Sequence, residues 1–263
     1  MTPARVFGGL LIALAVAGCT AHRLKGDDDQ LVELNRQCAA VDQRGDPTPC
    51  RQRYEQLAAA ALAEGRKSGA DVLTRVAFYR VAATAAFDAG PLGTQTLTES
   101  TDEGTQACEQ LPQKDASAPR DCALIRLAFP LGVTAELSRR LDDVIRARDA
   151  LRKTNPSAQL PASDLPTVLA LYDGFETQFD KVSALRAHLG DAAPDQLMVY
   201  EDDQRRAIYC WALEAYSVAF DVTGTTPASL AQLTARKTAL RQRAEQSLGV
   251  IDCRSTRPIA VAP

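Results

Sequence analysis

The chain has 263 residues, of which 46% are hydrophobic and 24% charged, and its formal net charge is −3. This balance is typical of a globular protein, and it excludes a wholly disordered chain and a polytopic membrane protein. No sustained basic stripe runs along the sequence, so we expect no nucleic acid among its partners.

The N-terminus has the features of an export signal. Arg5 supplies a positive charge, and an unbroken apolar run follows over residues 6–17. Such a run is too short to span a bilayer comfortably, but it fits the core of a secretory signal peptide. We therefore expect residues 1–18 to be a signal peptide that is removed.

The apolar run ends in Val16-Ala17-Gly18-Cys19, which resembles the lipobox of bacterial lipoproteins. The resemblance implies a diacylglyceryl group on the Cys19 thiol, cleavage before this residue, and a further acyl chain, such as palmitate, on the new amine. Two or more acyl chains anchor a protein stably in a membrane. Thr20 replaces the aspartate that tends to retain such proteins in the inner membrane, which implies the periplasmic face of the cell outer membrane. An ordinary secretory signal is the alternative.

Residues 19–30 are polar and include three adjacent aspartates, Asp27-Asp28-Asp29. We expect this segment to be a lipidated tether that reaches at most about 38 Å when extended. A calcium site at the aspartates is disfavoured, because adjacent side chains point in different directions and no glutamate follows at the required spacing.

Apolar residues recur at helical spacing through the rest of the chain. The predicted helices lie over approximately residues 30–41, 49–67, 72–90, 100–111, 120–153, 163–190, 194–222 and 226–249. Ser100 and Glu103 resemble a capping box that opens one helix, and Thr226 with Pro227 opens the last. Pro130 lies inside a long helix, which it should break or kink.

These seven or eight helices, without a convincing strand, predict an all-α protein that is either an antiparallel bundle or a short α-solenoid. Prolines concentrate in residues 155–166, which are the best candidate for a connection between a helical N-terminal half, residues 31–154, and a helical C-terminal half, residues 167–253. Residues 254–263 are expected to form a tail.

Six cysteines remain once Cys19 is assigned to the lipid. An even number in an exported chain predicts three disulfides, although many connectivities are open. We favour the local pairing, which is Cys38–Cys50, Cys108–Cys122 and Cys210–Cys253. A metal site is disfavoured, because no pair has the C-x₂-C spacing and the chain has only two histidines.

The histidines do not point to catalysis. His22 lies in the expected tether, and His188 lies near the end of a predicted helix, where a histidine interacts favourably with the helix dipole. Neither a G-x-S-x-G nor an H-E-x-x-H motif occurs in the sequence. We expect neither a cofactor nor a catalytic set.

Acidic residues cluster at two places on the predicted helices. Asp173, Glu176 and Asp180 share one helix face, as the paired carboxylates of a glycoside hydrolase do, but a solvated surface is the simpler interpretation. The acids at 201–203 and the arginines at 205–206 are also expected to form ion pairs on a helix surface.

Several aromatic residues fall on the apolar faces of the predicted helices. Core packing is their usual role. The alternative is a groove between helices that accepts a partner peptide or a lipid, and the residues that would line it are Tyr79, Tyr172, Phe175, Tyr209 and Trp211.

These features favour a non-enzymatic lipoprotein that interacts with a protein partner, or assists its assembly, in the cell envelope. Outer-membrane pilotins and assembly lipoproteins are similar in this outline only. A helical module that binds a small ligand or a lipid is the alternative, and an envelope hydrolase is a second, weaker one.

Overall fold

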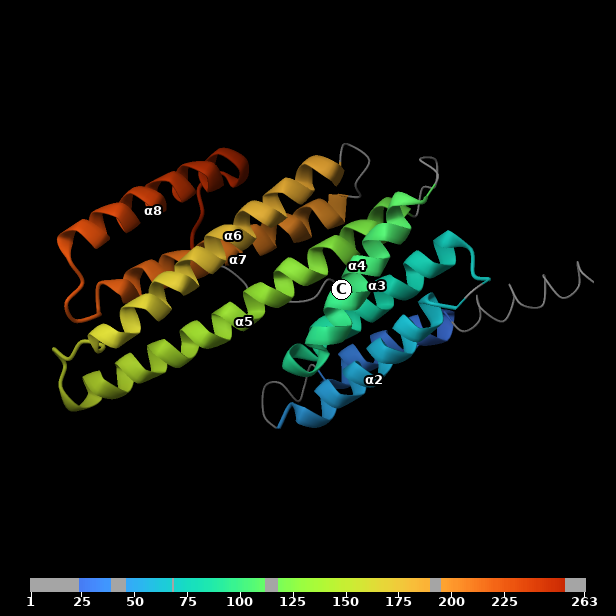
Figure 1. Ribbon diagram of the computed structural model, residues 1–263, viewed down its shortest axis with the longest axis horizontal. Helices are drawn as coiled ribbons and strands as arrows, with labels where there is room; N and C mark the ends of the chain where they lie inside the picture. The colour runs from blue at the N-terminus through green and yellow to red at the C-terminus, as the bar shows by residue number, and fades with distance from the viewer. Residues whose placement is uncertain (1–23, 39–45, 68, 112–117, 190–194, 254–263) are drawn as a thin grey trace, which may run out of the picture. The chain divides into compact units, whose positions relative to one another are not determined.

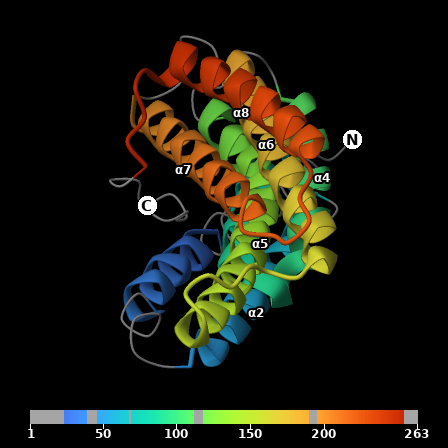
Figure 2. The ribbon, with the colours of Figure 1, turned by 90° about the vertical axis from the view of Figure 1, so that its left-hand side faces the viewer.

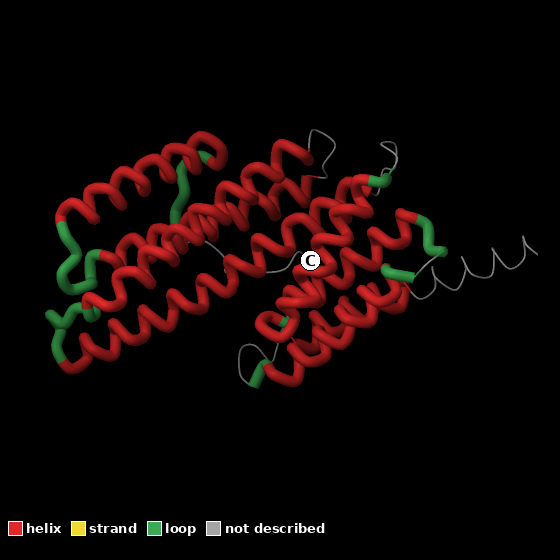
Figure 3. The backbone as a smooth tube through the Cα atoms, viewed as in Figure 1, coloured by secondary structure: helices red, strands yellow, loops and turns green. Residues whose placement is uncertain are grey.

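The computed structural model describes residues 24–38, 46–67, 69–111, 118–189 and 195–253. Most of these residues are helical, and Figure 3 shows the helices joined by short connections. The described residues contain no strand, and one isolated bridge pairs Leu160 with Val222. The predicted all-α class is confirmed.

The chain divides into two compact units, Met1–Phe129 and Pro130–Pro263, which we call unit 1 and unit 2. The described part of unit 1 contains a helix over residues 24–38, α2 (Thr48–Gly65), α3 (Val72–Asp88), the 3₁₀-helix η2 (Gly90–Gly93), α4 (Thr94–Glu109) and the start of α5 (Ala118–Thr154) (Figure 1). The described part of unit 2 contains the rest of α5, the 3₁₀-helix η3 (Ala162–Asp164), α6 (Leu165–Leu189), α7 (Asp195–Ala219) and α8 (Pro227–Leu248).

This division differs from the predicted boundary at residues 155–166. Those residues belong to unit 2, because the backbone of Leu160 is hydrogen-bonded to the connection between α7 and α8. The Leu160 amide donates to the carbonyl of Asp221 at 2.7 Å, and its carbonyl accepts from the amide of Thr223 at 2.8 Å. The prolines therefore mark a connection between two helices of one unit and not a linker between units.

The helix over residues 24–38 shortens the expected tether, since residues 24–30 belong to the folded unit. Asp28 accepts a hydrogen bond from Nη2 of Arg80 on α3 at 2.5 Å. Leu31 and Leu34 are buried in the core of unit 1. These contacts explain why the acidic segment is helical, although its composition is that of an exposed linker.

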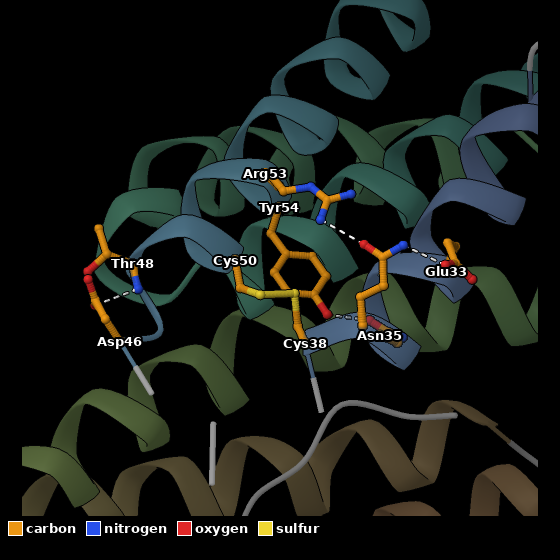
Figure 4. The surroundings of a disulfide bond; sticks show 9 residues. Glu33, Asn35, Cys38, Asp46, Thr48, Cys50, Arg53 and Tyr54 are labelled. Atoms are coloured by element: carbon orange, nitrogen blue, oxygen red, sulfur yellow. Dashed lines mark hydrogen bonds between the residues drawn. A yellow bond between two sulfur atoms is a disulfide. The ribbon is translucent and has the colours of Figure 1, made fainter. Parts of the chain in front are cut away.

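Figure 4 shows how the same helix is joined to α2. The Cys38–Cys50 disulfide links them, the Tyr54 hydroxyl donates to the Asn35 side chain at 2.8 Å, and Arg53 donates to the side chain of Gln37. The other two disulfides are Cys108–Cys122, between α4 and α5, and Cys210–Cys253, between α7 and the residues after α8. All three pairs are those that the sequence favours.

Two glycines allow α4 to approach α3 closely. A Cβ atom at Gly93 would lie 2.1 Å from the carbonyl oxygen of Ala86, and one at Gly104 would lie 2.9 Å from Cβ of Tyr79. Such distances are far below van der Waals contact, so only glycine fits at these positions.

The predicted start of α4 is wrong. The helix begins at Thr94, whereas Ser100 is buried in its middle and donates a hydrogen bond to the carbonyl of Leu97. The chain has already turned at Gly90, whose φ of 60° favours glycine, and Pro91 opens the 3₁₀-helix that leads into α4. The capping-box pattern at Ser100 is therefore accidental.

The other terminal signals agree better with the structure. Thr226 caps α8 by accepting a hydrogen bond from the amide of Ser229 at 3.2 Å, and Pro227 occupies the first turn, as predicted. Pro130 does not break α5, which is continuous from Ala118 to Thr154. The neighbouring Leu127 and Leu131 are buried, and their packing stabilises the helix despite one missing backbone hydrogen bond.

In unit 2, α6 packs against α7, and α8 lies beside them (Figures 1 and 2). Gly174 lets α6 approach α5, because a Cβ atom there would lie 2.7 Å from Cδ1 of Leu137. Leu233, Leu240 and Ala244 are the buried face of α8. Unit 2 is thus a helical bundle with its own apolar core.

Candidate functional site

The aromatic residues that would line a groove belong to two different units. Tyr79 lies in unit 1, on α3, and is 1% exposed. Its ring packs against Gly65, its Cβ atom lies beside Gly104, and its hydroxyl donates to Oε2 of Glu103 at 3.1 Å. Burial raises the pKa of this tyrosine. Tyr79 is therefore a residue of the core of unit 1.

The other four aromatic residues lie in unit 2, on α6 and α7. The rings of Phe175 and Trp211 are stacked, with centroids 6.4 Å apart. Tyr172 and Phe175 are fully buried and Tyr209 is 4% exposed, whereas Trp211 is half-buried. These rings fill the interior, so core packing describes them better than an open groove does.

The Tyr172 hydroxyl is buried and makes no hydrogen bond within the described structure. The Arg236 guanidinium of α8 lies 5.1 Å from the centroid of the Tyr172 ring, in a cation–π contact. Burial raises the pKa of this tyrosine. The Tyr172 side chain is thus held by burial and by the contact of its ring with Arg236.

The acidic face of α6 connects this helix to α8. Asp173 pairs with Arg236 at 2.6 Å, and Glu176 pairs with both Arg236 at 2.5 Å and Arg243 at 3.0 Å. Arg243 also reaches Asp180 at 3.3 Å. The carboxylates are therefore engaged by arginines of the neighbouring helix and do not form an isolated acid pair.

The acidic and basic residues at the start of α7 form ion pairs, but two of them are not on the surface. Glu201 is fully buried and Arg205 is 3% exposed, which contradicts a solvated face. Arg205 pairs with Asp202 at 2.6 Å and lies 3.5 Å from Glu201. Only the Arg206–Asp203 pair, at 3.2 Å, matches the expected surface pairing.

A second ion cluster, in unit 1, joins the end of α2 to α4. Arg66 donates to Glu99 at 2.6 Å and to both carboxylate oxygens of Glu103. The hydrogen bond from Arg66 holds the pKa of Glu103 below its usual value, and bonds from Gln95 and then Arg66 do the same for Glu99. The sequence did not predict this cluster, because Arg66 lies at the end of the predicted helix over residues 49–67 and its partners Glu99 and Glu103 follow 33 and 37 residues later in the chain.

Arg66→Gln should flatten the dependence of the stability of unit 1 on acidity. A carboxylate whose pKa is lowered by folding stabilises the folded state above its unfolded pKa, and this contribution is lost as the pH falls towards the folded pKa. The free energy of unfolding of the wild type should therefore decrease as the pH drops below 4.5, the ordinary pKa of glutamate. The free energy of unfolding of the variant should decrease less over the same pH range.

Urea unfolding followed by circular dichroism between about pH 3 and pH 7 measures this difference. Arg139→Gln is the control, because Arg139 forms an exposed pair with Glu136 within one helix. The free energy of unfolding of this variant should change with pH in the same way as that of the wild type. Equal acid sensitivity of Arg66→Gln and the wild type would contradict the role assigned to Arg66.

Three other predicted site residues lie wholly or partly outside the part of the chain that the structure describes. Cys19 and His22 lie outside the described residues, and the side chain of His188 is not described, although its backbone lies in the last turn of α6. Among the described residues, no three His, Cys, Asp or Glu side chains are arranged to hold a metal ion. None of the described helices is long and apolar enough to cross a membrane.

Comparisons of the chain with protein-family models, with curated proteins and with solved structures found no match. The functional argument therefore depends on the residues of this chain alone.

Proposed function

We propose that the chain is a bacterial lipoprotein, held at the periplasmic face of the outer membrane by acyl chains on Cys19. The observation that carries this proposal is the sequence Val16-Ala17-Gly18-Cys19 directly after the apolar run over residues 6–17. The disulfides support it, because three such bonds suit an oxidising compartment such as the periplasm.

Within the envelope, we propose a non-enzymatic role in which the helical units hold a protein partner near the membrane. The carboxylates that a hydrolase would use are paired with Arg236 and Arg243 in the structure. The rings that a small-ligand module would use are buried, except for Trp211. These observations favour an interaction role over both alternatives, so no second function is proposed.

Cys19→Ala tests the anchor. The variant should leave the membrane fraction and appear in the soluble periplasmic extract, because the thiol that accepts the lipid is gone. Thr20→Asp is the matched control: it retains the lipidated cysteine and should stay membrane-bound, with a shift towards the inner membrane. Retention of Cys19→Ala in the outer membrane would contradict the proposal.

Crosslinking of cells, followed by affinity purification and mass spectrometry, tests the interaction role. A stoichiometric envelope protein should be recovered with the wild type and be depleted with Cys19→Ala, which is no longer held at the membrane. Recovery of the chain alone, or of a bound lipid alone, would contradict a partner-holding role.

A further inference from the structure

The helix over residues 24–38 has two halves that differ in how firmly unit 1 holds them. In the second half, Leu31, Leu34 and Cys38 are buried in the core. In the first half, residues 24–30, no side chain is buried, and four of the seven residues are exposed. We call residues 24–30 the strap.

The second half of the helix is fastened covalently. The Cys38–Cys50 disulfide joins it to α2, and Figure 4 shows a hydrogen bond beside this disulfide, from the Tyr54 hydroxyl to the Asn35 side chain at 2.8 Å. Residues 31–38 therefore stay on unit 1 as long as this unit is folded and oxidised.

The strap is attached through weaker contacts. Leu24 is partly buried against the core, and Asp28, whose side chain is 40% exposed, pairs with Arg80 of α3 at 2.5 Å. At Gly26, no atom lies within 4 Å of the position that a Cβ atom would take. Glycine and aspartate are also poor helix formers, so residues 26–29 add little helical stability of their own.

Arg80 has a second acidic partner, which remains in place when the strap leaves. Asp121 of α5 lies 3.1 Å from Nε of Arg80. Breaking a buried ion pair is costly mainly because it leaves one charge without compensation. Here Asp28 would return to water while Arg80 keeps Asp121, so neither charge is left uncompensated. The arrangement therefore lowers the free-energy cost of releasing the strap.

We propose that the strap is a conformational device that gives the tether two lengths. It docks on α3 through Asp28, and it is released by local unwinding as far as Leu31 while the rest of unit 1 stays folded. Local opening of this kind occurs where few buried apolar contacts hold a segment. The polar tether that the sequence predicts and the helix that the structure shows over residues 24–30 are then two states of one segment.

The consequence for reach rests on the proposed anchor at Cys19. With the strap docked, the chain from Cys19 to Leu24 spans at most about 18 Å, and with the strap released, the chain from Cys19 to Leu31 spans at most about 43 Å. Unit 1 would thus hold a partner at two distances from the bilayer without losing its attachment.

Hydrogen exchange followed by NMR tests the release. The chain used is residues 20–263, exported behind a cleavable signal peptide so that the three disulfides form. Because this chain lacks Cys19, the result does not depend on the anchor, and failure of either proposal leaves the other standing.

The comparison is between the backbone amides of residues 28–30, which donate to carbonyls of the strap, and those of residues 35–38. The first group should exchange faster by a factor of about one hundred or more, because opening the second group exposes buried leucines. Equal exchange rates of the two groups would overturn the proposal.

A pair of matched variants tests the contact with Arg80. Asp28→Asn removes a charge-assisted bond, so it should speed the exchange of residues 28–30 about tenfold and leave residues 35–38 unchanged. Asp29→Asn makes the same chemical change at an exposed carboxylate, and its effect should stay within a factor of about two. Equal effects of the two variants would show that Arg80 does not hold the strap, and would overturn the proposal.

Gly26→Ala should act in the opposite direction. Alanine is the better helix former and has free space at this position, so the exchange of residues 28–30 should slow about fivefold. Residues 35–38 should not respond. A change of the same size in both groups would mean that the helix opens as one piece, which contradicts a separate strap.

Discussion

Gly93→Ala should destabilise unit 1 by about 3 kcal/mol or more, although it adds only one methyl group. The new Cβ atom would lie 2.1 Å from the carbonyl oxygen of Ala86 and 2.8 Å from its carbonyl carbon. Backbone atoms cannot rotate away as a side chain can, so α4 would have to move from α3. Overpacking of a core typically costs about 1–3 kcal/mol, and a backbone clash lies at or beyond the upper end of that range.

Urea unfolding monitored by circular dichroism measures this loss. Gly26→Ala is the matched control, because no atom lies within 4 Å of the Cβ position at Gly26, which is helical. Alanine is the better helix former by about 1 kcal/mol, so Gly26→Ala should be neutral or slightly stabilising. Equal stability of the two variants would show that α4 does not approach α3 as described.

Arg80→Ala should cost about 2–3 kcal/mol, because it removes the cation between two acids of unit 1. Arg80 reaches Asp28 at 2.5 Å and Asp121 at 3.1 Å, and its side chain is only 18% exposed. Burial is the main cause that raises the pKa of Asp121, and the Arg80 charge opposes that shift. Without Arg80, Asp121 would be a partly buried charge with little compensation.

The effect of Arg80→Ala should depend on pH in a defined direction. An acid whose pKa is raised by folding binds its proton more tightly in the folded state than in the unfolded state. This difference stabilises the folded state below the unfolded pKa of 3.8, and the stabilisation is lost as the pH rises through the folded pKa. The variant should therefore lose more stability at pH 7 than at pH 4, and adding Asp121→Asn should recover part of the loss.

Arg36→Ala is the control for this series, since Arg36 forms an exposed pair with Glu33 on the same N-terminal helix. Such a pair contributes little to stability, because solvent screens both charges. Thermal and urea unfolding of the three variants give the comparison. If Arg80→Ala behaved like Arg36→Ala, the N-terminal helix would not be held by its ion pair with α3.

Local signals in the sequence predicted the fold where short-range chemistry decides the outcome. Thr226 and Pro227 determine the start of α8 whatever surrounds them, and the three disulfides each join cysteines that are consecutive in the sequence. The predicted start of α4 was wrong because Ser100 is buried inside unit 1, and a local motif carries no information on tertiary contacts.

The polar residues were harder to place, for the same physical reason. Spacing predicted that Asp173, Glu176 and Asp180 share a face, but their arginines come from α8, about sixty residues later in the chain. Spacing also predicted the pairing of Arg205 with nearby acids, whereas its burial depends on tertiary packing. The aromatic residues look alike in sequence whether they fill a core or line a groove.

The order of the disulfides has a consequence for how the protein matures. Each bond joins cysteines that are neighbours in sequence, so Cys38 and Cys50 can pair before Cys108 appears, and Cys122 completes the second pair before Cys210. A chain that crosses a membrane from its N-terminus and is oxidised as it emerges forms every native bond in turn. Maturation then requires an oxidant but no reshuffling, which is the slow step for proteins with interleaved bonds.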